Sequence, residues 1–268
     1  TPLVALPGLA RELGIGALHL KDESARLGLG SFKALGGSWA VIRLVTEAAA
    51  ERLGQELDVS AIDVPEVREI AASMTFACAT DGNHGRSVAA AAQRAGARAV
   101  VFVHEGVSRE RVAAIERFGA TVHVVPGTYD DAVTEAARRS AEEGWTLLSD
   151  TSETDDAGET GEARVPGLVM QGYTALVREA LRDLAEPPTH VFVQAGVGGL
   201  AAAVAGHLFE TLGERRPRLI VVEPTRAACI LECARVGRPT AVPPGEPTVM
   251  AMLECYQALA DYRDMMVL

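Results

Sequence analysis

Short apolar strands and helices alternate through the middle of the chain, and this alternation most restricts the fold. Strands are predicted at residues 75–80, 99–103, 121–125 and 145–148. The helical segments between them end at Gly96, Gly119 and Gly144. A helix between successive strands lets them pair in parallel with right-handed crossovers, whereas antiparallel neighbours need only a tight turn. The pattern therefore predicts an α/β fold with a parallel sheet.

The same pattern returns in the last third of the chain. Helices are predicted at residues 168–184 and 200–212, and strands at residues 191–194 and 219–223. Thr225 is predicted to cap a further helix that ends at Gly237. We expect two three-layer α/β/α domains with parallel sheets. Between the two runs, residues 151–163 are acidic and lack apolar periodicity, which predicts a surface loop or, alternatively, a lid.

Composition narrows the functions that such a fold is expected to serve. The 268 residues include 25 basic and 36 acidic side chains, and the net charge of −11 argues against nucleic acid or an anionic membrane as the main partner. No apolar run is long enough to span a membrane and no signal peptide is evident, so a cytoplasmic location is expected. Cys229 and Cys233 are four residues apart and could hold zinc, but buried structural thiols explain them more simply.

A glycine-rich turn follows one of the predicted strands. Gly196-Val197-Gly198-Gly199 lies between a strand and a helix, at the sheet edge where open α/β proteins bind ligands. Bare backbone N–H groups and the helix dipole at such a turn can hold a phosphate. With Ala201 the turn also fits a dinucleotide fingerprint, and Glu223 stands where a ribose-binding acid would be. The turn predicts phosphate binding without identifying the ligand.

A second strand-to-helix turn is Asp81-Gly82-Asn83-His84-Gly85. Asn83 could hydrogen-bond a cofactor oxygen, with Asp81 as an acid or base beside it, although these residue types also favour tight turns for backbone reasons alone. His84 is interpreted as a turn histidine rather than a catalyst. Asp150 ends the fourth strand at the same sheet edge and is a third candidate.

Lys33 begins a predicted amphipathic helix, residues 32–54, after Ser31 as a plausible cap. The positive end of the helix dipole disfavours a second positive charge, so a partly buried lysine there would lose its proton more readily. A neutral lysine is what Schiff-base chemistry needs, but an isolated lysine of this kind is more simply an ordinary surface residue. A pyridoxal phosphate enzyme accounts for this lysine, the asparagine turn and the glycine turn together, whereas a dinucleotide enzyme accounts only for the last.

Taken together, these segments resemble the fold type II, tryptophan synthase β-like class of pyridoxal phosphate enzymes, and within it the diaminopropionate ammonia-lyases. The resemblance rests, in the family's order, on residues 21–24, 31–37, 79–86, 170–173, 194–198 and 248–251. Asp81 is the most discriminating position, because the related serine and threonine dehydratases usually carry serine there.

The resemblance implies a role for each candidate residue. Lys33 would carry pyridoxal 5'-phosphate and act as the base for the L-isomer of the substrate, and Asp81 would serve the D-isomer. Asp150 would also be catalytic. The implied cofactor contacts are Lys33, Phe32, Asn83, Gly196, Val197, Gly198, Gly199 and Leu200. The implied substrate contacts are Asp81, Asp150 and Thr248.

The resemblance also implies a reaction and an organisation. The expected activity is the conversion of 2,3-diaminopropionate to pyruvate and two ammonia by α,β-elimination, in a homodimer. Residues 1–37 and 164–268 would form a large cofactor-binding domain and residues 38–163 a small α/β domain, with a C-terminal part of the family's fold absent. The alternatives are a serine or threonine dehydratase-like enzyme of the same class, and a degenerate or dinucleotide-binding α/β protein.

Overall fold

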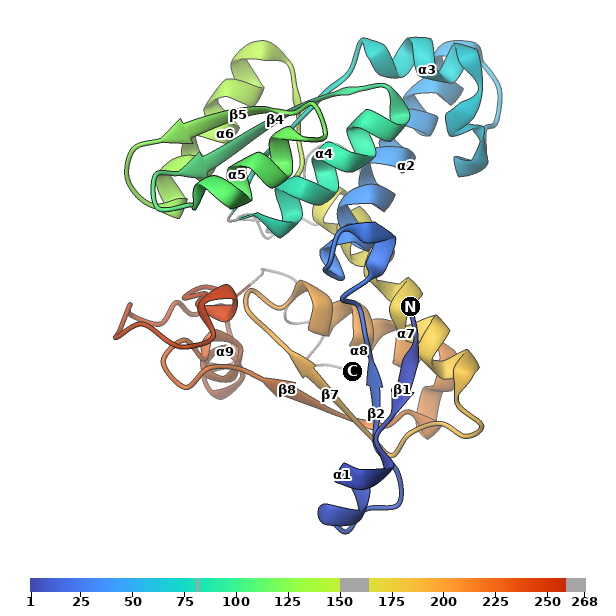
Figure 1. The fold of residues 1–268 in the computed structure, drawn as a ribbon, viewed down its shortest axis with the longest axis vertical. Coiled ribbons are helices and arrows are strands. Elements are labelled where there is room, and N and C mark those ends of the chain that lie inside the picture. Colours follow the sequence, from blue (N-terminus) through green and yellow to red (C-terminus); the bar gives the residue numbers. More distant parts are fainter. Residues whose placement is uncertain (81, 150–163, 259–268) are drawn as a thin grey trace. The chain divides into compact units, whose positions relative to one another are not determined.

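A computed structural model describes residues 1–80, 82–149 and 164–258 (Figure 1). The chain forms two compact units, Thr1–Ser149, here unit 1, and Asp150–Leu268, here unit 2. The predicted assignment of residues 1–37 and 164–268 to one domain and residues 38–163 to another stays a prediction.

Unit 1 combines a short antiparallel strand pair with a four-stranded sheet and its helices. Its elements are β1 (Leu3–Ala5), α1 (Pro7–Glu12), β2 (His19–Lys21), η1 (Arg26–Gly28), α2 (Lys33–Leu53), η2 (Val59–Asp63), α3 (Pro65–Ala72), β3 (Thr75–Ala79), α4 (Asn83–Ala95), β4 (Arg98–His104), α5 (Arg109–Glu116), β5 (Thr121–Val125), α6 (Tyr129–Glu143) and β6 (Thr146–Leu147). β1 pairs antiparallel with β2, and these two strands with α1 between them were predicted only in part.

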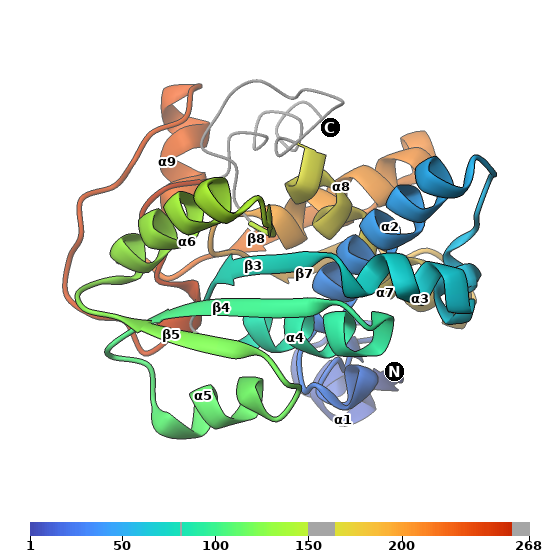
Figure 2. The same cartoon turned by 90° about the horizontal axis from the view of Figure 1, so that it is seen from above.

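The four-stranded sheet is entirely parallel, in the order β5-β4-β3-β6. Helices α4 and α5 lie on one face and α6 lies on the other (Figure 2). A sheet covered on both faces needs strands that are apolar throughout, and the first four residues of β3 are all buried. One core cluster joins the sheet to α6 through Ala77, Phe102 and Ala136. The predicted parallel α/β architecture is confirmed for this unit.

Glycine ends three of these helices where the sequence predicts a stop. Gly54, Gly96 and Gly144 have φ values of 63°, 85° and 68° and follow α2, α4 and α6. Glycine adopts this left-handed conformation without the steric cost of a Cβ, which is why it closes helices. α5 differs from the prediction, because it ends at Glu116 rather than at Gly119.

Unit 2 is built on a two-stranded parallel sheet within the described residues. Its elements are α7 (Val165–Asp183), β7 (His190–Gln194), α8 (Gly199–Leu212), η4 (Gly213–Arg215), β8 (Arg218–Val222), α9 (Cys229–Val236) and η5 (Ala251–Leu253). Its core joins α7, β7, α8 and α9 through Val177, Val193, Val204 and Ile230. Cys229 and Cys233 are buried, as predicted.

The start of α9 corrects the sequence prediction. Thr225 does not cap this helix, which begins at Cys229 after Ala228. The carboxylate of Glu223 instead accepts hydrogen bonds from the backbone N–H groups of Ile230 and Leu231, at 2.8 and 2.9 Å. A carboxylate seven and eight residues before its partners supplies the cap, which the local pattern around Thr225 could not indicate.

The described part of the chain contains neither a candidate membrane-spanning helix nor a candidate metal-binding cluster. None of its helices is both long enough and apolar enough to cross a membrane. Nor does this part contain a group of three or more His, Cys, Asp or Glu side chains that could hold a metal ion.

Candidate functional site

The segment that leads into Lys33 has an unusual backbone. Leu27, Gly28 and Gly30 have φ values of 50°, 69° and 69°. Leucine rarely adopts this left-handed conformation, and its side chain here is exposed. Strained backbone conformations cluster at active sites and ligand-binding segments.

Lys33 is the first residue of α2 and is half-buried. Its backbone N–H donates to the Ser31 hydroxyl at 3.2 Å, so Ser31 satisfies one of the first N–H groups of the helix, as expected of a cap, although Phe32 directly precedes the helix. The positive end of the helix dipole therefore lies at the predicted cofactor lysine.

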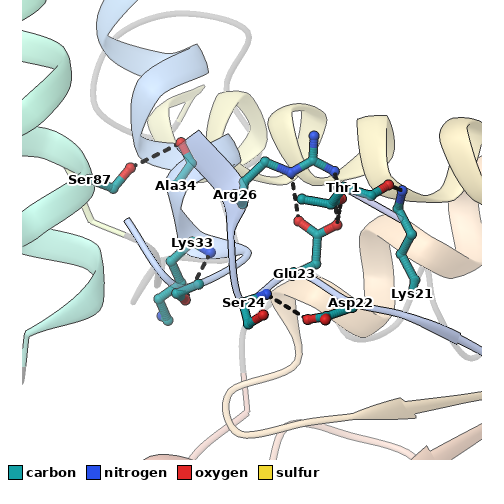
Figure 3. Close-up of polar contacts among 10 residues, drawn as sticks. Thr1, Lys21, Asp22, Glu23, Ser24, Arg26, Lys33, Ala34 and Ser87 are labelled. Atoms are coloured by element: carbon teal, nitrogen blue, oxygen red, sulfur yellow. Dashed lines mark hydrogen bonds and ion pairs between the residues drawn. The ribbon is translucent and has the colours of Figure 1, made fainter. Parts of the chain in front are cut away.

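Lys33 is one of only two lysines in the chain. The other, Lys21, donates from Nζ to the backbone oxygen of Thr1 at 2.5 Å (Figure 3). The Lys21 ammonium is thus used in a structural contact at the N-terminal strand pair, which leaves Lys33 as the better candidate for a covalent cofactor bond.

A buried ion pair orders the chain just before this segment. Arg26 donates from Nε to Glu23 Oε2 at 2.7 Å, and these side chains are only 9% and 14% exposed. Thr1 Oγ1 donates to Glu23 Oε1 at 2.6 Å (Figure 3). Burial alone would raise the pKa of Glu23, but the hydrogen bonds from Arg26 and Thr1 outweigh it and lower that pKa below its ordinary value. This group was not predicted from the sequence.

The first turn of α2 packs closely against α4. The Ser87 hydroxyl donates to the backbone oxygen of Ala34 at 3.2 Å (Figure 3). A Cβ on Gly37 would lie 2.5 Å from Ser87 Oγ and 2.9 Å from Ser87 Cβ. Only glycine lets the two helices approach this closely, so the lysine-bearing turn is held against the helix that Asn83 begins.

The Asn83 turn is organised by Thr80, which the sequence did not single out. The buried Thr80 hydroxyl accepts hydrogen bonds from the backbone N–H groups of Gly82 at 2.9 Å and Gly85 at 3.2 Å. Gly82 has φ 144°, a value that side-chain-bearing residues rarely adopt. This places Asn83, with an exposed side chain, at the first residue of α4. Asp81 lies outside the described residues.

Arg86 connects this turn to the segment before Lys33. Its Nη2 donates to the backbone oxygen of Leu29 and to Asn83 Oδ1, the latter at 3.2 Å. Burial, and then the charge of Arg117, lower the pKa of Arg86. Arg86 was not assigned a role from the sequence, although its position one helical turn after Asn83 puts both side chains on the same face of α4.

His84 is buried and its Nε2 lies 3.0 Å from the backbone oxygen of Leu148. A carbonyl oxygen only accepts, so Nε2 carries the proton in this bond. The contact supports the interpretation of His84 as a turn histidine, because it ties the start of α4 to the chain just after β6. Asp150 lies outside the described residues.

In unit 2 the glycine turn forms the start of α8. Gly198 has φ 108° and precedes the helix, whose first residue is Gly199. The first N–H groups of a helix lack intrahelical partners, so they can bind a phosphate. A Cβ on Gly196 would lie 2.8 Å from Cys255 Sγ, and the Cys229 thiol donates to the Gly196 oxygen at 3.5 Å. The turn, here called the glycine cradle, is thus closely packed at Gly196 and leads directly into the N-terminus of α8, which suits a phosphate group.

The structure also shows the surroundings of three other residues of unit 2 that the sequence analysis named or grouped, Glu223, Cys229 and Thr248. Both carboxylate oxygens of Glu223 cap α9, which gives this acid a structural role in place of the ribose contact of the dinucleotide alternative. Burial, followed by the Glu223 charge, raises the pKa of Cys229 to about 12, as expected of an unreactive structural thiol. The Thr248 N–H donates to Glu254 Oε2 at 3.0 Å, and its hydroxyl accepts from the Met250 N–H at 3.2 Å.

The fold and these turns define an α/β protein whose strand-to-helix turns are of the kind that bind phosphate-bearing ligands. A model of the pyridoxal-phosphate dependent enzyme family matches residues 1–266, and the chain belongs to this family. The predicted fold type II class and the predicted cofactor, pyridoxal 5'-phosphate, are confirmed by this membership. The lysine at a helix start and the glycine cradle fit that cofactor, since it needs an amine and a phosphate site.

Curated relatives narrow the comparison. The chain is 41% identical over 261 residues to the diaminopropionate ammonia-lyase of Salmonella typhimurium, covering 95% of this chain and 63% of the relative. It is 38% identical over 259 residues to the Escherichia coli enzyme of the same name, covering 95% and 62%. The chain thus spans a little under two thirds of the length of these relatives.

A solved structure gives the same result. The crystal structure of the Escherichia coli diaminopropionate ammonia-lyase, in complex with an aminoacrylate-PLP azomethine reaction intermediate, matches with a TM-score of 0.81 and 37% identity. The match covers 100% of this chain and 64% of that chain. The predicted resemblance to the diaminopropionate ammonia-lyases is therefore confirmed.

Proposed function

We propose that the protein is an ammonia-lyase that converts 2,3-diaminopropionate to pyruvate and two ammonia by α,β-elimination. The observation that carries the proposal is that Lys33 begins a helix, while Lys21, the only other lysine, is bound to the Thr1 oxygen. The likeness to diaminopropionate ammonia-lyases supplies the substrate. Bound pyridoxal phosphate supplies an electron sink that stabilises negative charge at the substrate α-carbon.

The proposed cofactor contacts are backbone and side-chain groups. Lys33 Nζ holds the cofactor covalently, with Phe32 beside it in sequence, and the Asn83 amide contacts the ring hydroxyl. The N–H groups of residues 196–200 bind the phosphate, supported by the positive end of the α8 dipole.

The proposed proton transfers belong to three residues. Lys33, once released, takes the α-proton of the L-isomer, because an amine at the positive end of a helix dipole is more readily neutral. Asp81 takes the α-proton of the D-isomer from the opposite face. Asp150 binds the substrate amino group, since a carboxylate suits a cationic diamine, and Thr248 contributes a further substrate contact.

Because the chain has only two lysines, the cofactor-bearing lysine can be identified directly. The purified chain is mixed with pyridoxal phosphate, reduced with borohydride and digested, and the modified peptide is identified by mass spectrometry. We expect the label on Lys33 and none on Lys21. Lys33→Ala should abolish both the label and the visible absorbance of the bound cofactor, whereas the matched variant Lys21→Ala should keep them. A label on Lys21, or absorbance that survives in Lys33→Ala, would refute the assignment.

Product analysis separates the lyase from the dehydratase alternative. Turnover of diaminopropionate should release two ammonia per pyruvate, and a dehydratase acting on serine would release one. Turnover of serine or threonine with no turnover of diaminopropionate would favour the alternative.

The proposal also includes a cytoplasmic homodimer. The dimer is expected from the class of enzyme. Light scattering after size-exclusion chromatography tests the dimer, and a monomer at micromolar concentration would contradict it.

A further inference from the structure

Arg86 makes an unusual set of contacts for an arginine. Its Nη2 reaches two uncharged oxygens, the Leu29 carbonyl and Asn83 Oδ1. Its Nε is buried without a hydrogen-bond partner. Within the described residues no carboxylate forms an ion pair with it. Arg86 is half-buried, and even partial withdrawal of a guanidinium from water without a counter-ion has a cost, so this placement calls for a compensating role.

The contact with Asn83 determines which amide atom faces Arg86. A guanidinium has only donors, so the atom 3.2 Å from Nη2 must be the amide oxygen rather than the nitrogen. The Nδ2 group, with its two donors, is then directed away from Arg86. Asn83 consequently offers hydrogen-bond donors to a ligand, which suits an electron-rich oxygen such as an ionised ring hydroxyl.

The contact with Leu29 holds the segment that precedes Lys33. Leu29 lies between Gly28 and Gly30, both with φ 69°, in the segment that leads to Lys33. Glycines give the backbone of such a segment many alternative conformations. A hydrogen bond to the carbonyl between them selects one conformation, and Nη2 would lie 3.5 Å from a Cβ on Gly30, so the guanidinium packs against the segment as well.

We propose that Arg86 is a positioning residue that arranges Asn83 and the segment preceding Lys33 before the cofactor arrives. One guanidinium fixes the amide of Asn83 and the backbone of residues 28–30, which are more than 50 residues away in sequence. The role toward the cofactor rests on the proposed function, whereas the tether between the two segments does not.

The tether is tested first on the cofactor-free protein. Hydrogen exchange of the amides of residues 27–32 should be faster in Arg86→Gln than in the unmodified chain, by roughly tenfold or more, because a charge-assisted hydrogen bond is lost. The matched control is Arg68→Gln, since Arg68 also donates to a backbone carbonyl, that of Arg94, at 3.0 Å. Unchanged exchange in Arg86→Gln would overturn the proposal whether or not the chain binds cofactor.

The action on Asn83 is tested by cofactor binding. Arg86→Gln should weaken pyridoxal phosphate binding roughly tenfold to hundredfold and move the absorbance maximum of the bound cofactor, whereas Arg68→Gln should do neither. Asn83→Ala should also weaken binding. The double variant should lose clearly less binding free energy than the sum of the losses in the two single variants. Strict additivity would overturn the action through Asn83.

Two further outcomes keep the test decisive. If Arg86→Gln does not fold, Arg86→Lys keeps a charge and a donor, and it should restore folding but only part of the affinity, because lysine lacks the planar fork. Full affinity in Arg86→Lys would overturn the proposal. If the unmodified chain fails to bind pyridoxal phosphate while the exchange result holds, the proposed function fails and the tether stands.

Discussion

At the scale of single residues, the chain uses glycine where a side chain would collide, and Gly37 is the clearest case. Its position faces Ser87, whose hydroxyl is itself engaged with the Ala34 oxygen and so cannot easily turn aside. Gly206, in α8, offers the contrast, because a Cβ there would meet nothing within 4 Å. The two glycines therefore have opposite reasons for being tolerated in a helix.

We predict that Gly37→Ala lowers the free energy of unfolding by about 1–3 kcal/mol, since overpacking outweighs the small gain in helix propensity. Gly206→Ala should raise it by about 0.5–1 kcal/mol, because alanine loses less backbone entropy in a helix. Urea titration measures both. A stabilising Gly37→Ala would show that α2 and α4 are packed less closely than described here.

At the scale of elements, the candidate site residues lie at the starts of helices, and each helix start has its own support. α2 uses Ser31, α4 uses the Thr80 hydroxyl at the preceding turn, and α9 uses the distant carboxylate of Glu223. α9 matters to the glycine turn because Cys229, its first residue, donates to the Gly196 oxygen. Capping of one helix is thus coupled to the shape of the cradle at another.

For this cap we predict that Glu223→Ala lowers the free energy of unfolding by about 1–2 kcal/mol and speeds hydrogen exchange of the Ile230 and Leu231 amides. Glu232→Ala, which removes an acidic residue of the first turn and its 3.7 Å pair with Arg235 but no capping hydrogen bond, should change stability by less than about 0.5 kcal/mol. Equal effects of the two substitutions would argue against the capping role.

At the scale of the whole molecule, the shifted carboxyl groups all move in one direction. Every described acidic side chain with a displaced pKa has it lowered, in most cases by hydrogen bonds from neighbouring groups: Asp22, Glu23, Asp58, Asp63, Glu110, Asp131, Glu135 and Glu254. Burial lowers the pKa of His207 as well. Burial of Cys229 raises its pKa to about 12.

These shifts predict how stability depends on pH. Groups with lowered pKa hold fewer protons in the folded chain than in the unfolded chain, so the stability they add is present above their ordinary pKa and is lost as the pH falls. Cys229 acts in the opposite sense, and its contribution is lost as the pH rises from about 9 toward 12. The urea midpoint should therefore be highest between about pH 6.5 and 9 and decline most steeply below about pH 4.5.

The acid limb has a specific control. Glu23→Gln keeps the shape of the side chain but removes the charge that Arg26 and Thr1 stabilise, so it should lower the midpoint at pH 7 and make the decline below about pH 4.5 shallower. An acid limb identical to that of the unmodified chain would show that this buried group does not contribute to acid sensitivity.

The sequence by itself determined the features that depend on near neighbours. The alternating periodicity of residues 75–148 sufficed for a parallel sheet, and Gly54, Gly96 and Gly144 marked helix ends, because both signals arise within one or two turns of the chain. The same locality explains the misplaced cap at Thr225. The joint occurrence of the Lys33, Asn83 and Gly196 segments sufficed for the family. The roles of Asp81 and Asp150 stay predictions.

Only the tertiary structure decided what surrounds those segments. Arg86 meets Leu29 across 57 residues, Ser87 meets Ala34 across 53, and His84 meets Leu148 across 64. No periodicity links such positions, because each contact is set by how helices and strands pack once they have formed. The sequence predicted Lys33 as a lysine at a helix start. The hydrogen bond from its N–H to Ser31, and the contact of Lys21 with the Thr1 oxygen, were shown only by the folded chain.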